Sequence, residues 1–226
     1  MNLTNKTVII TGGTKGLGKA LALSFKEKGV NVVICAKDKG GFKNLPEGIL
    51  GIKADVTKEK DLQNLLNKTL RKFRQLDVWI NNAGIWLPHL SMEKTDWKRA
   101  HKIMEVNFFG IVYGSKIALT QMRKQNYGII INILSIRSLD PRAGESAYTA
   151  SKFAAKGFTD SIRKEINNEN IKLLSVYPGK IQTNLFNEAK PQNYEQFMTP
   201  KSVAEKIIEN LIKKTPEKHL VIKHLA

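Results

Sequence analysis

Tyr148 and Lys152 lie four residues apart in the sequence S-A-Y-T-A-S-K that begins at Ser146. If this run is helical, the two side chains share one face, with Cβ atoms roughly 5–6 Å apart. A free tyrosine titrates near pH ~10, and a cation about 4 Å away contributes ~4 kcal/mol at an effective dielectric constant of ~20. Because one pKa unit corresponds to ~1.4 kcal/mol, the ammonium could lower the pKa of the phenol by up to about three units. The pair predicts a general acid or base near neutral pH, although Y-x-x-x-K spacing also arises by chance.

A glycine-rich turn near the N-terminus strengthens the catalytic interpretation. The apolar run 8–10 predicts a buried strand, the sequence T-G-G-T-K-G-L-G fills 11–18, and apolar residues then repeat at helical spacing. In a strand–turn–helix context, backbone N–H groups at the start of the helix bind a pyrophosphate. The spacing of Gly12, Gly16 and Gly18 is G-x-x-x-G-x-G, which differs from the usual dinucleotide fingerprint and from a P-loop. A βα turn without a ligand is the alternative at this point.

Seven motifs in order make the chain resemble a short-chain dehydrogenase/reductase over nearly its whole length. The glycine turn is similar to T-G-x-x-x-G-x-G of that family, residues 81–84 read N-N-A-G, and residues 178–183 fit P-G-x-[IV]-x-T. Asp55-Val56 resembles the family's adenine-contacting acidic position. Asn107, Ser135 and the Y-x-x-x-K pair complete the set, in the family's order and at its spacing.

The resemblance implies four catalytic residues: Asn107, Ser135, Tyr148 and Lys152. Tyr148 is expected to act as the acid in carbonyl reduction and as the base in alcohol oxidation, with Lys152 lowering its pKa and holding the nicotinamide ribose. Ser135 is expected to donate a hydrogen bond to the substrate oxygen. Asn107 is expected to shape a helix break and to hold a water in a proton relay to Lys152. Taken singly, Ser135 could be an ordinary turn residue and Asn107 a satisfied helix asparagine.

The same resemblance implies cofactor-binding residues in six segments. They are Gly12, Thr14, Lys15, Gly16, Leu17, Gly18, Lys37, Asp55, Val56, Asn82, Ala83, Gly84, Tyr148, Lys152, Pro178, Gly179, Ile181 and Thr183. Ile181 and Thr183 are expected to contact the nicotinamide carboxamide. No metal is expected, because no metal-ligand pattern with cysteines or carboxylates is shown by the histidines His89, His101, His219 and His224.

Two lysines favour NADP(H) over NAD(H) as the cofactor. In dinucleotide-binding folds an acidic residue about 20 positions after the glycines binds the ribose 2′-OH of NAD, and a basic residue accommodates the 2′-phosphate of NADP. The predicted strand 31–36 ends at Ala36, where NAD-type family members carry Asp, and Lys37 follows. Lys15 lies in the glycine turn, where a basic residue is typical of NADP-type members. Asp38 keeps NAD(H) open, since a shift of this loop would bring its carboxylate to the ribose.

The elements that must position these residues alternate between strand and helix. Strands are predicted at 7–11, 31–36, 49–54, 76–81, 128–134, 172–177 and 219–223, and helices at 16–28, 58–73, 93–124, 147–167 and 200–213. This alternation predicts an α/β Rossmann fold, with a doubly wound parallel sheet of about seven strands and helices on both faces. The glycines Gly40 and Gly41 and the proline Pro46 limit 37–48 to about one helical turn. The long helix is expected to begin after Ser91 as N-cap, with close packing or a bend at Gly110 and Gly114.

Length and composition predict one domain over residues 1–226, since a chain of this size can bury a full α/β core. No apolar stretch approaches the ~20 residues that a membrane span needs, and the N-terminus lacks secretory character. Cys35 is the single cysteine, so no internal disulfide forms, and a cytoplasmic setting is expected. The formal net charge is +17, but the lysines are spread without a nucleic-acid-binding motif, so no nucleic acid is expected as a partner.

The family resemblance implies a small carbonyl or alcohol substrate, bound by three segments. These are 86–89, the stretch between Ser135 and Tyr148, and residues 184–199, which are expected to form a lid. Arg137 and Arg142 in the second segment indicate either an anionic or polar substrate or ordinary surface arginines. A homodimer or homotetramer is expected through the helices at 93–124 and 147–167. The alternative function is a catalytically silent, dinucleotide-sensing binding protein of the same fold.

Overall fold

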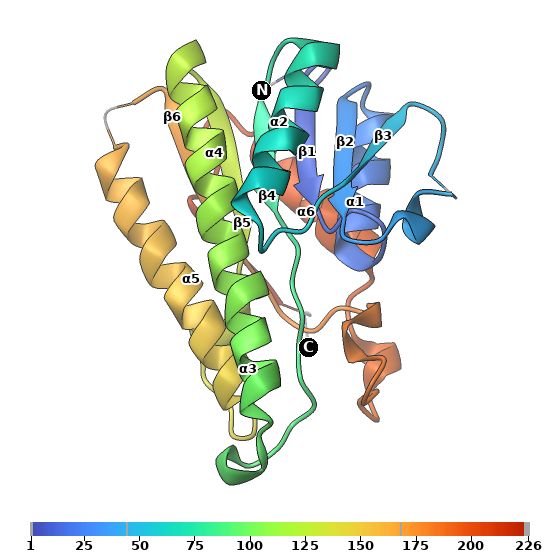
Figure 1. Cartoon of the computed structure of the whole chain (residues 1–226), viewed down its shortest axis with the longest axis vertical. Helices are drawn as coiled ribbons and strands as arrows, with labels where there is room; N and C mark the ends of the chain where they lie inside the picture. Colours follow the sequence, from blue (N-terminus) through green and yellow to red (C-terminus); the bar gives the residue numbers. More distant parts are fainter. Residues whose placement is uncertain (1, 44, 168, 224–226) are drawn as a thin grey trace.

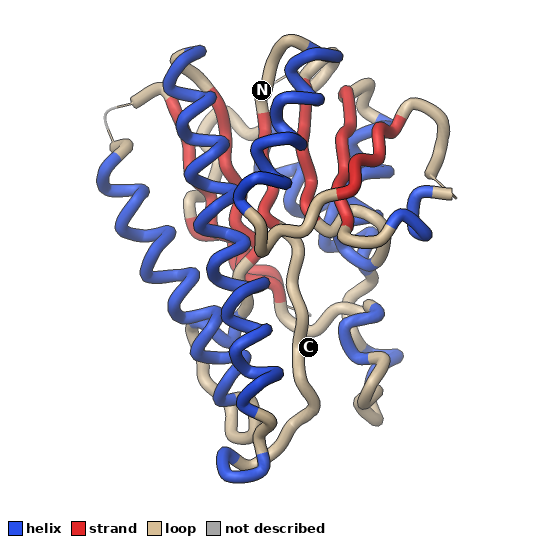
Figure 2. The backbone as a smooth tube through the Cα atoms, in the orientation of Figure 1, coloured by secondary structure: helices blue, strands red, loops and turns tan. Residues whose placement is uncertain are grey.

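The computed structural model describes residues 2–43, 45–167 and 169–223. Within these residues a seven-stranded parallel sheet runs in the order β3-β2-β1-β4-β5-β6-β7 (Figures 1 and 2). The strands are β1 (Thr7–Thr11), β2 (Asn31–Ala36), β3 (Ile49–Lys53), β4 (Val78–Asn81), β5 (Gly128–Ile133), β6 (Ile171–Pro178) and β7 (His219–Ile222). The predicted α/β fold and parallel sheet are confirmed. The chain order reverses direction between β1 and β4, and ligands bind outside the carboxyl ends of strands at such a point.

The inner strands, unlike the edge strands β3 and β7, are buried on both faces, and their alternating side chains enter two separate cores. Val8 and Ile10 of β1 join one apolar cluster, whereas Ile9 between them joins the other. The first core is closed by α1 (Gly16–Glu27) and α6 (Pro200–Ile212). The second is closed by α2 (Glu59–Phe73) and α4 (Gly110–Gln125). A small third core joins α4 to α5 (Ser146–Glu165), which lies beside α4 in Figure 1. Covering both faces is what allows a parallel sheet to be built from such continuous apolar runs.

The connections contain short 3₁₀ turns in place of regular helices. They are η1 (Lys39–Phe42), η2 (Met92–Lys94), η4 (Ile136–Ser138), η5 (Asn184–Phe186) and η6 (Tyr194–Gln196). The single turn η1 agrees with the expectation for the glycine- and proline-containing loop 37–48, of which residue 44 lies outside the described residues. No helix in the described part of the chain has the length and apolarity that a bilayer crossing requires.

The predicted continuous helix 93–124 is wrong at its start and in its interior. The α-helix α3 (Trp97–Met104) begins later, because the Asp96 carboxylate caps it by accepting from the backbone N–H groups of Lys98 (2.9 Å) and Arg99 (3.3 Å). The Ser91 hydroxyl donates instead to a side-chain carboxylate, that of Glu93. A π-helical segment, η3 (Glu105–Phe109), then separates α3 from α4, although the three form one rod in Figure 1.

Gly110 and Gly114 allow α4 to lie very close to its neighbours, as expected. A Cβ atom at Gly110 would lie 3.1 Å from Val56 Cγ2, and one at Gly114 would lie 2.9 Å from the Trp79 indole nitrogen and overlap the Asn81 side chain. Any larger residue at Gly114 would therefore push α4 away from β4. The close approach of backbone to side chain explains why glycine stands there.

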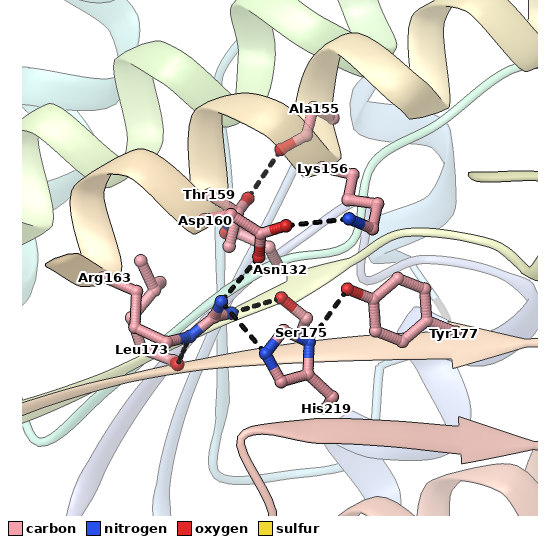
Figure 3. A network of polar contacts seen from close by, with 10 residues as sticks. All are labelled: Asn132, Ala155, Lys156, Thr159, Asp160, Arg163, Leu173, Ser175, Tyr177 and His219. Atoms are coloured by element: carbon pink, nitrogen blue, oxygen red, sulfur yellow. Dashed lines mark hydrogen bonds and ion pairs between the residues drawn. The ribbon is translucent and has the colours of Figure 1, made fainter. Parts of the chain in front are cut away.

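A polar network joins α5 to the last two strands (Figure 3). The guanidinium of Arg163 donates to the Leu173 carbonyl (3.1 Å), to the Ser175 hydroxyl (2.5 Å) and to the Asp160 carboxylate (2.5 Å). Strand β7 begins its pairing opposite Ser175, so the Leu173 carbonyl precedes the part of β6 that β7 covers. The Arg163 side chain is only 12% exposed. It donates hydrogen bonds to the Leu173 carbonyl and the Ser175 hydroxyl of β6, and so fixes α5 against β6.

We expect Arg163→Met to lower the free energy of unfolding by about 2–3 kcal/mol, because it leaves a partly buried carboxylate and strand groups without their donor. Urea denaturation followed by circular dichroism would measure the loss. Lys164→Met, at the exposed neighbouring position, is the matched control and should change stability by less than about 0.5 kcal/mol. Equal stability of the two variants would contradict the role given to this network.

Candidate active site

One cleft, with a volume of about 1620 Å³, collects nearly all of the residues that the sequence nominated. It lies at the carboxyl ends of the strands and is lined by every predicted cofactor-binding residue and by Ser135, Tyr148 and Lys152. Asn107 is the exception among the predicted catalytic residues, since it is completely buried behind the cleft. Predicted site residues up to 171 positions apart in the chain, Gly12 and Thr183, therefore meet in one place, because parallel strands deliver their carboxyl ends to the same edge of the sheet.

The glycine turn and the N-N-A-G segment are bound to each other at the floor of this cleft. The Thr11 hydroxyl accepts from the backbone N–H groups of Asn82 (2.9 Å) and Ala83 (3.0 Å), and the Asn82 amide donates to the Thr11 carbonyl (2.8 Å). Gly12 has a φ of +65°, and a Cβ atom there would lie 2.9 Å from Ala83 Cα. Asn82 and Ala83 therefore shape the turn in addition to lining the cleft.

The residues present fit the pyrophosphate of a dinucleotide. Helix α1 begins at Gly16 immediately after the turn, and its N-cap residue Lys15 makes no side-chain capping hydrogen bond. The first-turn N–H groups of a twelve-residue helix are thus left for a ligand, and the helix dipole favours an anion there. Lys15 is exposed and also lines the cleft.

Asp55 and Lys37 line the cleft where β3 and β2 end, away from Ser135 and Tyr148. The Asp55 carboxylate accepts from the Thr57 N–H (3.0 Å) and hydroxyl (2.8 Å) and lies 3.6 Å from the Lys37 ammonium. Partial burial opposes ionisation, but these hydrogen bonds and the cation hold the pKa of Asp55 below its ordinary value. The Lys37–Asp55 ion pair is a contact that sequence reasoning did not predict, because it joins two separate strand ends.

Lys152 is a buried cation whose hydrogen-bond acceptor is a backbone carbonyl. Its side chain comes from α5, and Nζ donates to the Ile133 carbonyl oxygen at the end of β5 (3.0 Å). Burial lowers the pKa of Lys152 to about 8. Nζ lies 5.9 Å from the centre of the Tyr148 ring, so the predicted proximity of the pair is confirmed.

The predicted lowering of the Tyr148 pKa is wrong for the protein alone. Desolvation raises the pKa of Tyr148 to about 12, which outweighs the lowering effect of a hydrogen bond with Ser135. Glu145 raises the pKa further and Arg137 lowers it. The prediction from spacing failed because it counted only the charge of the Lys152 ammonium and left out the burial of the phenol, which favours the neutral form of Tyr148.

Asn107 holds the segment after β4 against α5. Its Oδ1 accepts from the Ile85 N–H (2.9 Å), and its Nδ2 donates to the Ile85 carbonyl (2.9 Å) and to the Ser151 hydroxyl (3.1 Å). The π-helical segment that contains Asn107 is the helix break that the family resemblance implied. The water relay to Lys152 stays a prediction. Through Ile85, Asn107 also fixes Gly84, where a Cβ atom would lie 3.4 Å from Asn107 Oδ1 and 3.9 Å from Lys152 Nζ.

Glu145 joins three segments beside Tyr148 and was missed by sequence reasoning. Its buried carboxylate contacts Arg137 Nε (2.9 Å) and His89 Nε2 (2.5 Å). Arg137 follows Ser135 by two residues, and the Ser135 hydroxyl accepts from the Arg137 N–H (3.1 Å). The ion pair therefore ties the segment of Ser135 to the start of α5. A lone acidic residue three positions before Tyr148 carries no spacing signal, so only its burial and its partners identify it.

The predicted lid contributes an aromatic wall. Phe186 of η5 lies 5.2 Å from Trp86 and 5.7 Å from Phe197, ring centre to ring centre, and contacts Tyr194 at 6.3 Å. Trp86 and Phe186 line the cleft. In Figure 1 this segment, in orange, lies beyond the carboxyl ends of the strands. The described residues contain no group of three or more His, Cys, Asp or Glu side chains placed to hold a metal, and His224 lies outside them.

Comparisons with known proteins agree with this geometry. The family model described as short chain dehydrogenase matches residues 6–194. L-fucose dehydrogenase of Mus musculus is 35% identical over 188 residues, which cover 82% of this chain and 68% of that protein. Glucose 1-dehydrogenase 2 of Bacillus subtilis (strain 168) is 34% identical over 208 residues, covering 86% of this chain and 79% of that protein.

A solved structure extends the likeness to the whole fold. ElxO with NADP bound superposes with a TM-score of 0.85 and 30% sequence identity, covering 96% of this chain and 96% of that chain. The sequence match, the strand order and the cleft agree with one another. The chain therefore belongs to the short-chain dehydrogenase/reductase family and is an NAD(P)-dependent oxidoreductase acting on CH–OH groups.

Proposed function

We propose that this chain is an NADP(H)-dependent oxidoreductase that interconverts a carbonyl compound and its secondary alcohol, with Tyr148 as the acid/base. The observation that carries the proposal is the convergence of Tyr148, Ser135 and Lys152 on a cleft whose floor fits a dinucleotide. A protein that only senses a dinucleotide has no need of this set. The proposed catalytic and cofactor-binding residues are those that the sequence nominated, with Asn107 as a positioning residue behind them.

The bound nicotinamide supplies or accepts the hydride at the substrate carbon. In reduction, Ser135 donates a hydrogen bond to the carbonyl oxygen, and Tyr148 gives its phenolic proton to that oxygen as the alcohol forms. A raised pKa keeps Tyr148 protonated at neutral pH, which suits the acid role. The Lys152 ammonium stabilises the phenolate that remains, so its charge acts when the proton has left. In oxidation the same groups run in reverse.

Lys15 and Lys37 support the choice of NADP(H). Both line the cleft, and the Lys37 side chain is 64% exposed, so its long contact with Asp55 can give way to a phosphate. ElxO, the relative solved with NADP, is consistent with this choice. Asp38 also lines the cleft, which is why the preference needs a direct test.

We also propose a cytoplasmic homodimer or homotetramer assembled through α4 and α5. Phe153 on α5 is 41% exposed, and Phe109, in the π-helical segment before α4, is 36% exposed. Exposed aromatic side chains of this kind are common at subunit interfaces. The single cysteine, Cys35, is buried and unpaired, in keeping with a reducing compartment.

Tyr148→Phe should lower kcat by about 10²- to 10⁴-fold without abolishing cofactor binding, because the ring stays and only the transferable proton is lost. The measurement is NADPH oxidation against ketones, aldehydes, quinones and keto-acyl compounds, and NADP⁺ reduction with sugars. Tyr127→Phe, which alters a tyrosine outside the cleft, is the control. Turnover of Tyr148→Phe at the wild-type level would refute the assignment.

Lys152→Met should stabilise the cofactor-free protein at neutral pH. Since folding lowers the pKa of Lys152 from 10.5 to about 8, the unfolded chain holds more protons between these values, and wild-type stability rises with pH there. Below pH ~8 the full penalty applies, so the variant should be more stable by about 1–3 kcal/mol after loss of the Ile133 hydrogen bond.

Urea denaturation of both proteins at pH values from 7 to about 10.5 would check this, and the difference should shrink as the pH rises. Lys206→Met on α6 alters an exposed lysine and should show no such trend. A stability difference that does not change with pH would contradict the buried-cation interpretation of Lys152.

Lys37→Asp should shift the preference from NADP(H) toward NAD(H) by about ten-fold or more in the ratio of kcat/KM values, because a carboxylate repels a 2′-phosphate and accepts from a 2′-OH. Lys39→Asp makes the same charge change two residues further along the loop, outside the residues that line the cleft, and is the control. An unchanged ratio for Lys37→Asp would argue against NADP(H) selection by this lysine.

A further inference from the structure

The catalytic end of the cleft carries more positive charge than the proposed chemistry uses. Arg137, Arg142 and Lys180 all line it, close to Ser135 and Tyr148. The sequence indicated a substrate contact as one alternative for the two arginines but not for Lys180, which occupies a variable position of the P-G-x-[IV]-x-T motif. The question is which of these three cations is available to a substrate.

Arg137 is not available, because the protein already uses it. Its Nε contacts the buried Glu145 carboxylate (2.9 Å), and its Nη1 donates to the Asp140 carbonyl (3.1 Å). The side chain is only 14% exposed. The other oxygen of Glu145, Oε1, lies 2.5 Å from His89 Nε2. The expectation that Arg137 meets a substrate anion is therefore set aside.

Lys180 and Arg142 differ, since no ion pair with an acidic side chain is formed by either of them in the described part of the chain. The Lys180 ammonium is half-buried and lies 5.0 Å from the centre of the Phe197 ring. Burial lowers the pKa of Lys180, and repulsion from Arg142 and Arg137 lowers it further, against a smaller opposing effect of Glu145. Arg142 is exposed, whereas Lys180 is half-buried, and a half-buried cation beside like charges is stabilised when an anion enters.

We infer that Lys180 and Arg142 bind a carboxylate of the substrate, so that the enzyme acts on keto acids or hydroxy acids. This inference rests on the proposed function for the identity of the reacting carbonyl, and on the cleft alone for the anion. Lys180 lies in the sequence between Gly179 and Ile181, which are both proposed cofactor-binding residues, and Ile181 is expected to contact the nicotinamide carboxamide. Lys180 is therefore expected near the reacting end of the cofactor. A carboxylate held there would also orient the substrate toward Ser135 and Tyr148.

The aromatic wall defines the rest of the substrate. Trp86 is only 9% exposed, packs against Phe186 of the lid segment, and faces the same cleft. The substrate body beyond its carboxylate is therefore expected to be apolar. This sets the proposed substrate apart from the neutral sugars named for two relatives, which offer hydroxyl groups and no charge.

The test is isothermal titration calorimetry of the full chain with saturating NADP⁺. The probes are straight-chain carboxylates from acetate to octanoate and the uncharged primary amide of each. We expect at least one carboxylate to bind about ten-fold or more tightly than its amide, and Lys180→Met or Arg142→Met each to reduce that preference by about ten-fold. High salt should weaken carboxylate binding and leave amide binding unchanged.

Matched controls are Lys124→Met on α4 and Arg71→Met on α2, which remove the same charges outside the cleft and should leave the preference unchanged. Thermal melting of each variant establishes that it is folded. The inference is overturned if acids and amides bind equally, or if the Lys180→Met/Arg142→Met double variant keeps the preference. It is also overturned if these variants weaken NADP⁺ binding while acids and amides still bind alike, because the cations would then serve the cofactor.

Turnover separates this inference from the proposed function. Keto acids and their methyl esters are compared in the same NADPH assay, with Tyr148→Phe as the inactive variant. Turnover of esters and sugars but not of acids overturns the anion site and leaves the oxidoreductase function intact. Carboxylate-selective binding without turnover of any compound supports the anion site and counts against the oxidoreductase function.

Discussion

A lysine ammonium held in the protein interior, with a backbone carbonyl as its hydrogen-bond acceptor, is the constraint on which the rest of this site depends. Lys152 is 5% exposed and donates to the Ile133 carbonyl, and burial favours its neutral form. A group of this kind is unfavourable in the empty protein and becomes favourable when ligand hydroxyls and a phenolate surround it. The cleft is thus organised for a bound state, at some expense to the stability of the free protein. Burial also favours the neutral form of Tyr148, which raises the pKa of the phenol, so the tyrosine keeps its proton until the reaction removes it.

Holding such a group in place requires helices that cannot slide on the sheet, and buried amides provide this. The Trp79 indole donates to Asn81 (2.7 Å), Asn81 donates to Asn132 (2.8 Å) and to Ser115 (3.1 Å), and Asn132 donates to Thr159 (2.9 Å). This series of hydrogen bonds crosses from β4 to β5 and reaches both α4 and α5. Apolar packing tolerates small shifts between a helix and a sheet, whereas a shift that leaves a buried amide without its partner costs free energy. The network therefore fixes the position of α5 along the sheet, and with it the catalytic residues that α5 carries. Asn107 is a further buried amide of this kind, and it joins the segment after β4 to α5.

The charge of the chain has an uneven distribution that composition alone conceals. Most of the excess positive charge lies on the surface, where solvent screens it. At the catalytic end of the cleft, the Glu145 carboxylate contacts Arg137 and His89, whereas Arg142 and Lys180 form no ion pair with an acidic side chain in the described part of the chain. A half-buried cation such as Lys180 acts differently from one on an open surface, because its repulsion by the exposed Arg142 and its attraction for an anion both increase. The same formal charge can therefore mean solubility in one place and recognition in another.

The fold could be predicted from the amino-acid sequence, and the motifs nominated the residues of the proposed site. Alternating apolar runs and helical repeats require a doubly wound sheet, and motif spacing identified the residues that this sheet brings to one cleft, together with Asn107, which lies buried behind it. The chemical behaviour of these residues depends on contacts that form only in the folded protein. The Tyr148 pKa rises where spacing predicted a fall, because desolvation depends on everything packed around the phenol. Glu145 acquires its role from His89 and Arg137, which lie far away or carry no motif. The predicted helix 93–124 starts later because Asp96 caps α3 locally, and it is interrupted by the π-helical segment, where Asn107 is hydrogen-bonded across the fold to Ile85 and Ser151. Local patterns determine which elements form, whereas burial and partners, which are properties of the whole molecule, determine their chemistry.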